Sequence, residues 1–346
     1  MKLIIQVPCF NEEQTLGQVL ADLPKTIPGL DVVETLVIND GSTDATSQLA
    51  RSMGVHHIVE LPHNRGLAVA WLAGIDACLR EGADIIVNTD GDNQYAGDDI
   101  AKLVAPIVNG EAEMVIGARP IEEIRHFSWL KKRLQRLGSW AVTVFTGIQV
   151  PDAASGFRAY TREAALLLSA VRPQYTHTID TLIRAAQKNL KIRSVPVRVN
   201  EKARDSRLIA STRQYVWRQS LILLRVFTMT QPLKVFGLAA LAFLMLGLAG
   251  CVRFLVYYVA NGGSGHVQSV VISAGLIVVG FVVGMIGLAA DMISANRELI
   301  EDSLYRLRKA ELERWNANRA AAARDTGSKR EAGDAPQALR RGGTVV

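Results

Sequence analysis

Two aspartates separated by one glycine stand in the segment N-T-D-G-D-N-Q, residues 88–94, directly after a short apolar run that reads as a buried strand. At this spacing the carboxylates of Asp90 and Asp92 can converge on one hard cation, and Gln94 can add an amide oxygen. Oxygen ligands of this kind suit Mg²⁺ or Mn²⁺ bound together with a diphosphate. The plainer alternative is a turn rich in Asp and Asn, whose side chains bond the nearby backbone.

Apolar and amphipathic segments that alternate along the chain predict the elements that position these residues. We expect strands at 3–7, 33–38, 57–61, 84–87 and 114–116. We expect a first helix capped by Asn11 that stops at Pro24, a second capped by Ser42 or Thr43 that ends near Gly54, and a third at 67–79. This order predicts an α/β fold with a mostly parallel sheet flanked by helices, in which ligands bind at the carboxyl ends of the strands.

Two long apolar segments, 235–260 and 269–290, follow this α/β part. Each exceeds the roughly 20 residues that cross a bilayer, and each is apolar all round, which disfavours two buried core helices. Their connection at 261–268 has no Lys or Arg while both flanks are basic, so the positive-inside rule predicts a hairpin with both ends in the cytoplasm. The predicted location is therefore the cell (inner) membrane, multi-pass, with the catalytic part and both termini cytoplasmic.

The remaining segments complete the predicted domain organisation. Residues 1–210 form the α/β domain, 211–234 an amphipathic juxtamembrane region at the interface, and 235–293 the two spans. Residues 294–316 are expected to form a charged cytoplasmic helix, and the polar stretch 317–346 to be disordered. No signal peptide is visible at the start of the chain.

Composition and charge exclude several classes of function. The net charge is +6, and many basic residues lie between Arg193 and Lys234, beside the apolar segments, where they attract anionic headgroups or a phosphate. That position argues against nucleic-acid binding. The three cysteines, Cys9, Cys78 and Cys251, lie far apart and indicate neither a disulfide framework nor a metal knuckle.

A series of motifs occurs in order along the first part of the chain. They are V-P-C-F-N-E-E at 7–13, I-N-D-G-S-T-D at 38–44, N-R-G at 64–66, T-D-G-D-N-Q at 89–94, G-A-R at 117–119 and D-A-A-S-G-F-R at 152–158. This series resembles the family 2 glycosyltransferases with the GT-A fold. Within that family it is similar to the polyprenyl-phosphate glycosyltransferases, a group that includes dolichol-phosphate mannose synthase. The resemblance covers residues 1 to about 210, and the two-helix anchor matches the membrane-bound members.

The resemblance implies a role for each motif. The residues that it implies for the nucleotide sugar are Pro8, Phe10, Glu12, Asp40, Asp90, Gly91, Asp92, Arg204 and Arg207. Those implied for the acceptor phosphate are Arg119, Arg136, Ser139, Ser155 and Arg158. Those implied for the chemical step are Asp90, Asp92, Asp152 and Arg119, with the metal on Asp92 and Gln94.

Some positions depart from the family pattern or fit a simpler explanation. Arg204 and Arg207 stand in A-R-D-S-R-L where the family usually has R-x-x-G-x-S-K, and Phe10 replaces the usual tyrosine. Arg136 fits a solvated basic helix face equally well. His177 and Asp180 could suggest a catalytic dyad, but a polar cluster at the start of a helix explains them better.

The reaction implied is metal-dependent, inverting transfer of a sugar from a UDP- or GDP-sugar to a polyprenyl phosphate. Arginines would position the acceptor phosphate, which is already ionised near neutrality and needs no strong base. Two alternatives stay open: transfer to another membrane lipid hydroxyl, with Asp152 as the first candidate base, and a non-catalytic nucleotide-sugar-binding membrane protein. The sequence leaves open the sugar, the nucleotide base, the polyprenol and whether the chain forms a homo-oligomer. Processive synthesis is disfavoured because Q-x-x-R-W is absent, and dinucleotide binding because no G-x-G-x-x-G follows the first strand.

Overall fold

The computed structural model describes residues 1–120, 139, 143, 147–169, 177–200, 228, 231–261 and 267–333. The predicted interfacial helix within 211–234 falls almost entirely outside these residues. The chain divides into two compact units. The first unit consists of residues 1–115, 157–172 and 305–346, and the second of residues 116–156 and 173–304.

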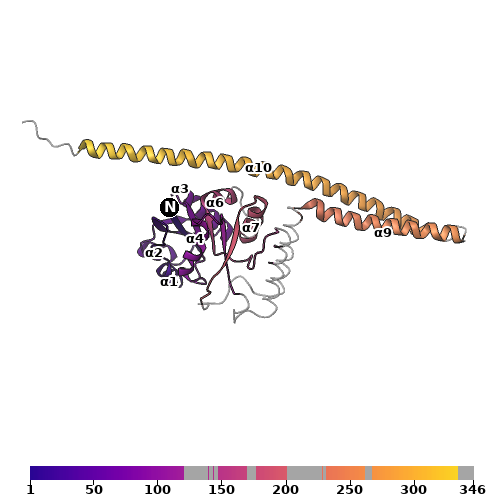
Figure 1. Ribbon diagram of the computed structural model, residues 1–346, viewed down its shortest axis with the longest axis horizontal. Coiled ribbons are helices and arrows are strands. Elements are labelled where there is room, and N and C mark those ends of the chain that lie inside the picture. The colour runs from indigo at the N-terminus through magenta and orange to yellow at the C-terminus, as the bar shows by residue number, and fades with distance from the viewer. Residues whose placement is uncertain are drawn as a thin grey trace, which may run out of the picture. The chain divides into compact units, whose positions relative to one another are not determined.

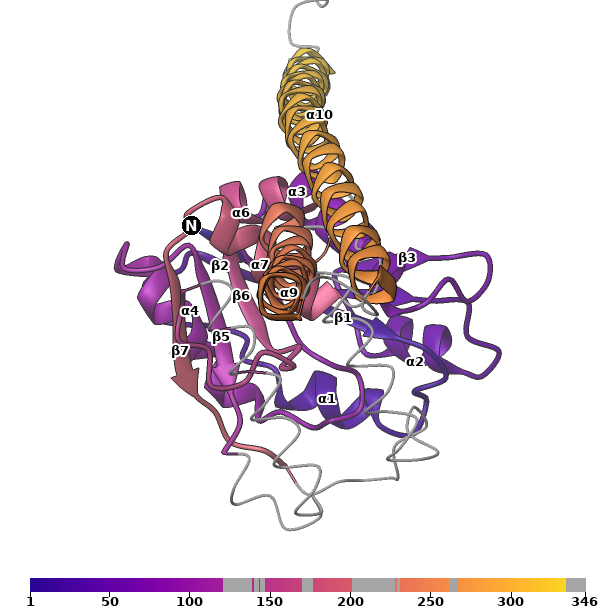
Figure 2. The same ribbon diagram turned by 90° about the vertical axis from the view of Figure 1, so that its right-hand side faces the viewer.

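The α/β part, drawn in Figure 1, contains a seven-stranded sheet with the strand order β3-β2-β1-β4-β6-β5-β7. Most of these strands are labelled in Figure 2. The strands are β1 (Lys2–Cys9), β2 (Val32–Asn39), β3 (His57–Glu60), β4 (Ile85–Asn88), β5 (Met114–Ala118), β6 (Arg158–Thr161) and β7 (Ile192–Pro196). β1 pairs in parallel with β2 and with β4, and β2 with β3, whereas β4 and β6 are antiparallel. The predicted mostly parallel sheet is confirmed, and the sequence did not indicate the antiparallel pairing of β4 with β6.

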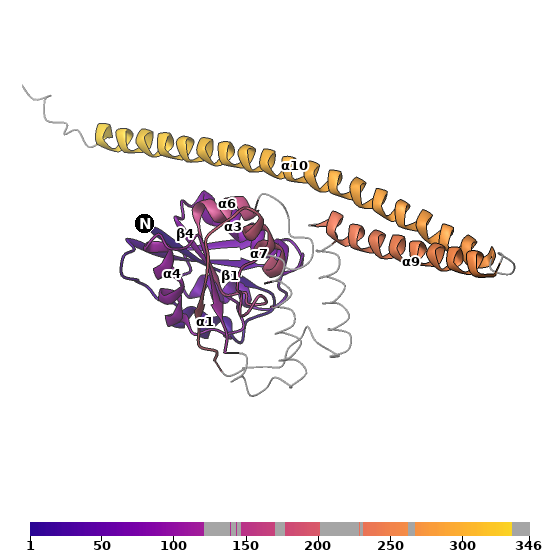
Figure 3. The same ribbon diagram turned by 45° about the vertical axis from the view of Figure 1, so that its right-hand side comes forward.

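Helices flank the sheet in the first unit, where α3 lies on one side and α1 on the other (Figure 3). The helices of the α/β part are α1 (Leu16–Asp22), α2 (Thr46–Ser52), α3 (Leu67–Arg80), α4 (Ile100–Val108), α6 (Arg162–Ser169) and α7 (His177–Gln187), with a short 3-10 helix η1 (Gly97–Asp99) before α4. α3 matches its predicted range and buries its apolar face, including Trp71 and Ile75, against β1 and β2. The predicted caps of the first two helices are wrong, because α1 begins after Thr15 and α2 after Ala45, neither with a side-chain cap.

Two long apolar helices, α9 (Pro232–Asn261) and α10 (Val267–Gly333), contain the predicted spans. The apolar stretches are only 11% and 17% buried, which is unlike a core helix and is consistent with lipid contact. Within this pair the backbones approach closely. A Cβ on Gly247 would lie 2.9 Å from the carbonyl oxygen of Ser273, and a Cβ on Gly280 would lie 3.1 Å from that of Ala240. Small residues at such contacts are typical of helices packed in a membrane.

α10 does not end where the second apolar stretch ends. The charged segment predicted as a separate helix at 294–316 continues the same helix, which runs through to Gly333 where disorder was expected. In the second unit, Lys188 of α7 pairs with Asp302 of α10 at 2.6 Å. In the first unit, Arg80 of α3 pairs with Glu311 of α10 at 3.0 Å and lies over the ring of Trp315 at 5.0 Å. The charged part of α10 is therefore held by side chains and is not a free tail.

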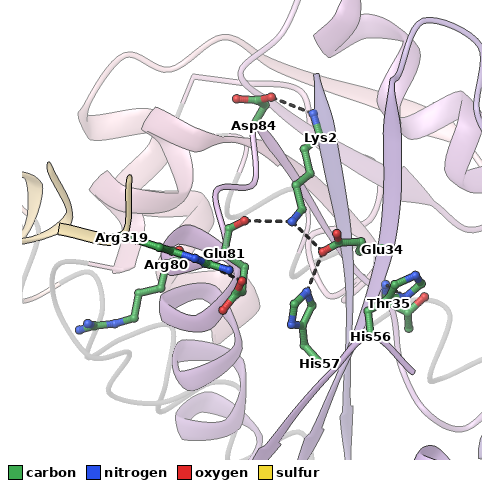
Figure 4. Close-up of polar contacts among 9 residues, drawn as sticks. All are labelled: Lys2, Glu34, Thr35, His56, His57, Arg80, Glu81, Asp84 and Arg319. Atoms are coloured by element: carbon green, nitrogen blue, oxygen red, sulfur yellow. Dashed lines mark hydrogen bonds and ion pairs between the residues drawn. The ribbon is translucent and has the colours of Figure 1, made fainter. Parts of the chain in front are cut away.

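A polar cluster joins the first three strands at the end where β1 begins (Figure 4). Glu34 of β2 pairs with Lys2 of β1 at 2.7 Å and with His57 of β3 at 2.6 Å. Lys2 also donates to the carbonyl oxygen of Glu81 at 3.0 Å (Figure 4). Burial alone would raise the pKa of Glu34, but the hydrogen bonds and charges of Lys2 and His57 outweigh it and hold that pKa below its ordinary value. The carboxylate therefore cross-links three neighbouring strands.

We expect Glu34→Gln to lower the free energy of unfolding near neutral pH by about 1 kcal/mol, or roughly 2–4 °C in Tm. Because the native pKa is depressed, the contribution is present above the ordinary glutamate pKa of about 4.3 and is lost as pH falls through the native value. Thermal melts of the full chain in detergent should therefore show a gap from the wild type at pH 6–7 that closes below about pH 4.

The matched control is Asp22→Asn, which removes an exposed carboxylate at the end of α1. It should leave the melting temperature unchanged at both pH values. A gap for Glu34→Gln that is the same at pH 3.5 and pH 7 would contradict the assigned charge contribution.

Candidate active site

The carboxyl ends of β1, β2 and β4 meet at one edge of the sheet. Cys9 lies opposite Asn39 in the β1–β2 register, and Gln6 lies opposite Asn88 in the β1–β4 register. The amide of Thr89 continues the pairing to the carbonyl oxygen of Gln6 at 3.1 Å. The structure therefore brings together three of the predicted site segments, 8–12, 40–41 and 88–94.

The loops after β1 and β2 are hydrogen-bonded to each other through their motif side chains. The amide of Asn11 donates to Ser42 Oγ, and the amide of Thr43 donates to Asn11 Oδ1, both at 2.9 Å. Glu13 Oε2 accepts from the amide of Ala45 at 3.0 Å. Asn11 adopts a φ of 55°, which asparagine tolerates better than most residues. These bonds explain the incorrect caps, because the side chains expected to cap a helix bind the neighbouring loop.

Asp40 orders the loop that follows β3. Its Oδ1 accepts from the amide of Arg65 at 2.8 Å and its Oδ2 from that of Gly66 at 2.9 Å, and the residue is 3% exposed. Gly41 has a φ of 67°, and a Cβ there would lie 2.4 Å from the backbone carbon of His63. Asp40 thus positions the N-R-G motif, and its predicted contact with a nucleotide stays a prediction.

The loop after β4 alternates in exposure from residue to residue. Asp90, Asp92 and Gln94 are partly exposed, whereas Gly91, Asn93 and Tyr95 are buried. The amide of Gln94 donates to Asp92 Oδ1 at 3.2 Å, so the loop is also the Asp-rich turn that the sequence offered as the alternative. The alternation gives the oxygen donors of this turn an accessible side. A divalent cation fits that donor set.

In the part of the chain that the structure describes, no group of three or more His, Cys, Asp or Glu side chains gathers where it could hold a metal ion. Cys9 is fully buried beneath the site, and burial raises the pKa of its thiol well above the ordinary value. Cys9 therefore stays a neutral thiol and packs as a small apolar residue, as predicted.

A buried ion pair forms a second cluster, within the second unit. Arg119 Nε donates to Asp152 Oδ2 at 2.6 Å, and Arg119 Nη2 donates to Oδ1 at 3.1 Å. The Arg119 side chain is 9% exposed and that of Asp152 is not exposed at all. The guanidinium thus engages both carboxylate oxygens of Asp152, and the carboxylate fixes the direction of Arg119.

Three of the other residues predicted to bind the acceptor phosphate are buried in the structure. Ser139 is 7% exposed and its Oγ accepts from the amide of Ala153 at 3.3 Å, while Ser155 and Arg158 have no exposed surface. The predicted contacts of Ser155 and Arg158 with an acceptor phosphate stay predictions. Arg136, Arg204 and Arg207 lie outside the described residues.

Some residues that shape the site gave no signal in the sequence. Thr15 Oγ1 lies 2.8 Å from the carbonyl oxygen of Gly91 and 2.9 Å from Glu12 Oε2. The ring of Tyr95 stacks on that of Phe157 with centroids 4.7 Å apart. Tyr95 is adjacent to the D-x-D motif and Phe157 lies inside S-G-F-R, so motif proximity was the available clue. His177 and Asp180 both lie in the first described turn of α7.

The fold is that of known glycosyl-transferring enzymes with the GT-A architecture. The crystal structure of glucosyl-3-phosphoglycerate synthase from Mycobacterium tuberculosis superposes with a TM-score of 0.50 and 24% sequence identity, over 64% of this chain and 79% of that chain. Residues 4–167 match the model of glycosyl transferase family 2.

Curated relatives carry the assignment to the family. A dolichyl-phosphate hexose transferase of Haloferax volcanii is 32% identical over 211 residues, 60% of this chain and 86% of the relative. A polyprenol monophosphomannose synthase of Mycolicibacterium smegmatis is 28% identical over 211 residues, 58% of this chain and 78% of the relative. The chain belongs to glycosyl transferase family 2 and is a glycosyltransferase.

We expect Asp152→Asn to destabilise the second unit by about 3 kcal/mol, because it removes a carboxylate that balances the buried Arg119 charge. If Asp152 acts by orienting Arg119, the surviving enzyme should show a raised KM for its acceptor with a pH–rate profile of unchanged shape. Thermal melts and acceptor titrations across pH would measure both effects.

Arg119→Lys serves as the companion variant, since lysine keeps the charge but loses the two-point contact. It should raise the acceptor KM in the same way. Loss of kcat at unchanged acceptor KM, together with loss of the acidic limb of the pH profile, would instead identify Asp152 as a general base.

Proposed function

We propose that this glycosyltransferase moves a hexose from a UDP- or GDP-sugar onto the phosphate of a polyprenyl phosphate at the membrane, with inversion at the anomeric carbon. The single observation that carries the proposal is the pair of exposed apolar helices, α9 and α10, on a family 2 chain. A lipid acceptor would account for such helices, because they would hold the enzyme at the bilayer where that acceptor lies. Two relatives, a dolichyl-phosphate hexose transferase and a polyprenol monophosphomannose synthase, carry names that support the same acceptor class.

The loop after β4 is the proposed site for the nucleotide diphosphate. Asp90, Asp92 and Gln94 share its accessible side, and Asp92 and Gln94 would hold Mg²⁺ or Mn²⁺ through oxygen atoms. A bound divalent ion would supply charge stabilisation for the departing diphosphate. Pro8, Phe10 and Glu12, at the end of β1, are proposed to bind the base and ribose. Phe10 is 38% exposed, as a side chain available to stack on a base would be.

Arg119 is the proposed ligand of the acceptor phosphate, oriented by Asp152. A phosphate monoester has a second pKa near 6 and is mostly ionised at neutral pH, so it needs a fixed cation more than a base. A lipid hydroxyl would need a base, and the engagement of both Asp152 oxygens by Arg119 weighs against that alternative. A non-catalytic nucleotide-sugar-binding protein is the remaining alternative, and turnover decides it.

The proposed topology places the catalytic part and both termini in the cytoplasm. The connection between α9 and α10 has no Lys or Arg, whereas residues on both sides of the two helices are basic. Nucleotide sugars and the charged part of α10 would then share one compartment.

Membranes containing the chain, incubated with a panel of radiolabelled nucleotide sugars and Mn²⁺, should pass label from one sugar into extracted lipid. The labelled product should be acid-labile and alkali-stable, as expected for a sugar linked to a polyprenyl phosphate. Asp92→Ala should reduce transfer by about 10²-fold or more, because it removes charge stabilisation of the leaving group. Asp98→Ala, which removes an exposed carboxylate in η1, is the matched control and should transfer normally.

Hydrolysis of the nucleotide sugar with and without Mn²⁺ separates the alternatives. Turnover without label in lipid would contradict the polyprenyl-phosphate acceptor, and no turnover with any sugar would favour the binding protein. Full activity of Asp92→Ala in correctly inserted chain would contradict the metal assignment.

A further inference from the structure

The loop after β4 has a second side that faces the protein. Its members Gly91, Asn93 and Tyr95 are buried, and they alternate with the partly exposed oxygen donors. In this short turn the buried and the partly exposed residues follow one another along the backbone, so contacts that fix the buried residues also restrict the direction of the donors. Asn93 has a φ of 58°, in the left-handed region that asparagine tolerates better than most residues.

Thr15 and Cys9 anchor the first half of this loop. Thr15 is 5% exposed, and its Oγ1 lies 2.8 Å from the carbonyl oxygen of Gly91. Thr15 occupies the N-cap position of α1, yet its hydroxyl makes no cap hydrogen bond and is directed to the loop and to Glu12. A Cβ on Gly91 would lie 3.0 Å from Cys9 Sγ, so the loop backbone already rests against β1.

Tyr95 and Phe157 anchor the second half. Their rings stack with an interplanar angle of 21° and centroids 4.7 Å apart, and the residues are 5% and 0% exposed. Phe157 directly precedes β6, which pairs antiparallel with β4. The loop begins at the end of β4, and the Tyr95–Phe157 stack attaches it to the start of the neighbouring strand, β6.

We propose that Thr15 and the Tyr95–Phe157 ring pair are positioning residues for the diphosphate-binding loop. They hold its buried side, and the oxygen atoms of Asp90, Asp92 and Gln94 are thereby ordered before any ligand arrives. The identity of the ligand rests on the proposed function, whereas the anchoring itself does not. Ordering in advance lowers the conformational cost of binding, so loss of an anchor should weaken binding of metal and nucleotide sugar more than it slows the chemical step.

The ring pair is tested with Tyr95→Leu and Phe157→Leu in the full chain. Tyr95→Phe is the conservative variant that keeps the ring, and Tyr160→Leu is the matched control. Tyr160 is also fully buried, on β6, but its ring packs edge-on against Trp71 at 6.2 Å. Hydrogen exchange of peptides covering residues 88–96 reports on the loop without any ligand. Titration of Mn²⁺ and of nucleotide sugar in the hydrolysis assay reports on binding.

Tyr95→Leu and Phe157→Leu should speed exchange in the loop peptides by about tenfold, given the strength of an aromatic pair. The metal concentration for half-maximal activity should rise by a similar factor, with a smaller change in kcat. Tyr95→Phe should match the wild type, and Tyr160→Leu should leave loop exchange unchanged even if it lowers Tm.

The threonine anchor is tested with Thr15→Val, which keeps the shape and removes the hydroxyl, against Thr15→Ser, which keeps the hydroxyl. Valine should speed exchange at the loop and serine should not. This pair decides the proposal if a ring variant fails to fold.

Loop exchange in Tyr95→Leu and Thr15→Val equal to that of Tyr160→Leu and wild type would overturn the anchoring. Faster exchange with unchanged dependence on metal and nucleotide sugar would overturn the link from anchoring to binding. If the wild-type chain hydrolyses no nucleotide sugar, the proposed function fails, and hydrogen exchange still tests the anchors.

Discussion

The parallel pairing of β1 with β2 on one side and β4 on the other is the constraint on which the site depends. This register ends the three strands at one edge, so motifs that are far apart in the sequence become neighbours. Loops at such an edge cannot all be stabilised by their own helices. Asn11 and Ser42 instead join the first two loops by hydrogen bonds, and Asp40 orders the third segment through the amides of Arg65 and Gly66. The edge is consequently built as one connected unit of backbone and polar side chains.

Polar residues at this edge of the sheet fall into two groups: those that hydrogen-bond the backbone of a neighbouring loop, and those whose oxygen atoms are partly exposed. Asn11, Glu13, Asp40 and Thr15 satisfy backbone groups of neighbouring loops, which leaves those loops ordered at little cost in buried unpaired atoms. The oxygen donors of the loop after β4 are partly exposed, and one of them, Asp92, also accepts a hydrogen bond from the amide of Gln94. A family motif mixes both kinds, so membership of a motif does not by itself make a residue a ligand contact.

The sequence predicted β1 to β5, the helix at 67–79, the apolar helices and the family well, because these depend on periodicity, length and short motifs, but it did not predict β6 and β7. It misplaced the caps of α1 and α2 because Asn11 and Ser42 satisfy each other across 31 positions of sequence, and local rules see only neighbours within a few residues. It missed the stack of Tyr95 on Phe157 for the same reason. The motif gave no indication that Arg158 is completely buried on β6, because burial depends on the whole sheet.

The Arg119–Asp152 pair connects the geometry of the acceptor side to the choice of acceptor. A buried guanidinium is costly unless an anion balances it, and Asp152 provides that balance with both oxygens. This pair holds the Arg119 cation in a fixed direction, and it occupies the Asp152 carboxylate that was the candidate base. It suits an acceptor that arrives already ionised and needs only to be held. A polyprenyl phosphate is such an acceptor, whereas a lipid alcohol is not, so on the proposed function the ion pair itself selects the chemistry.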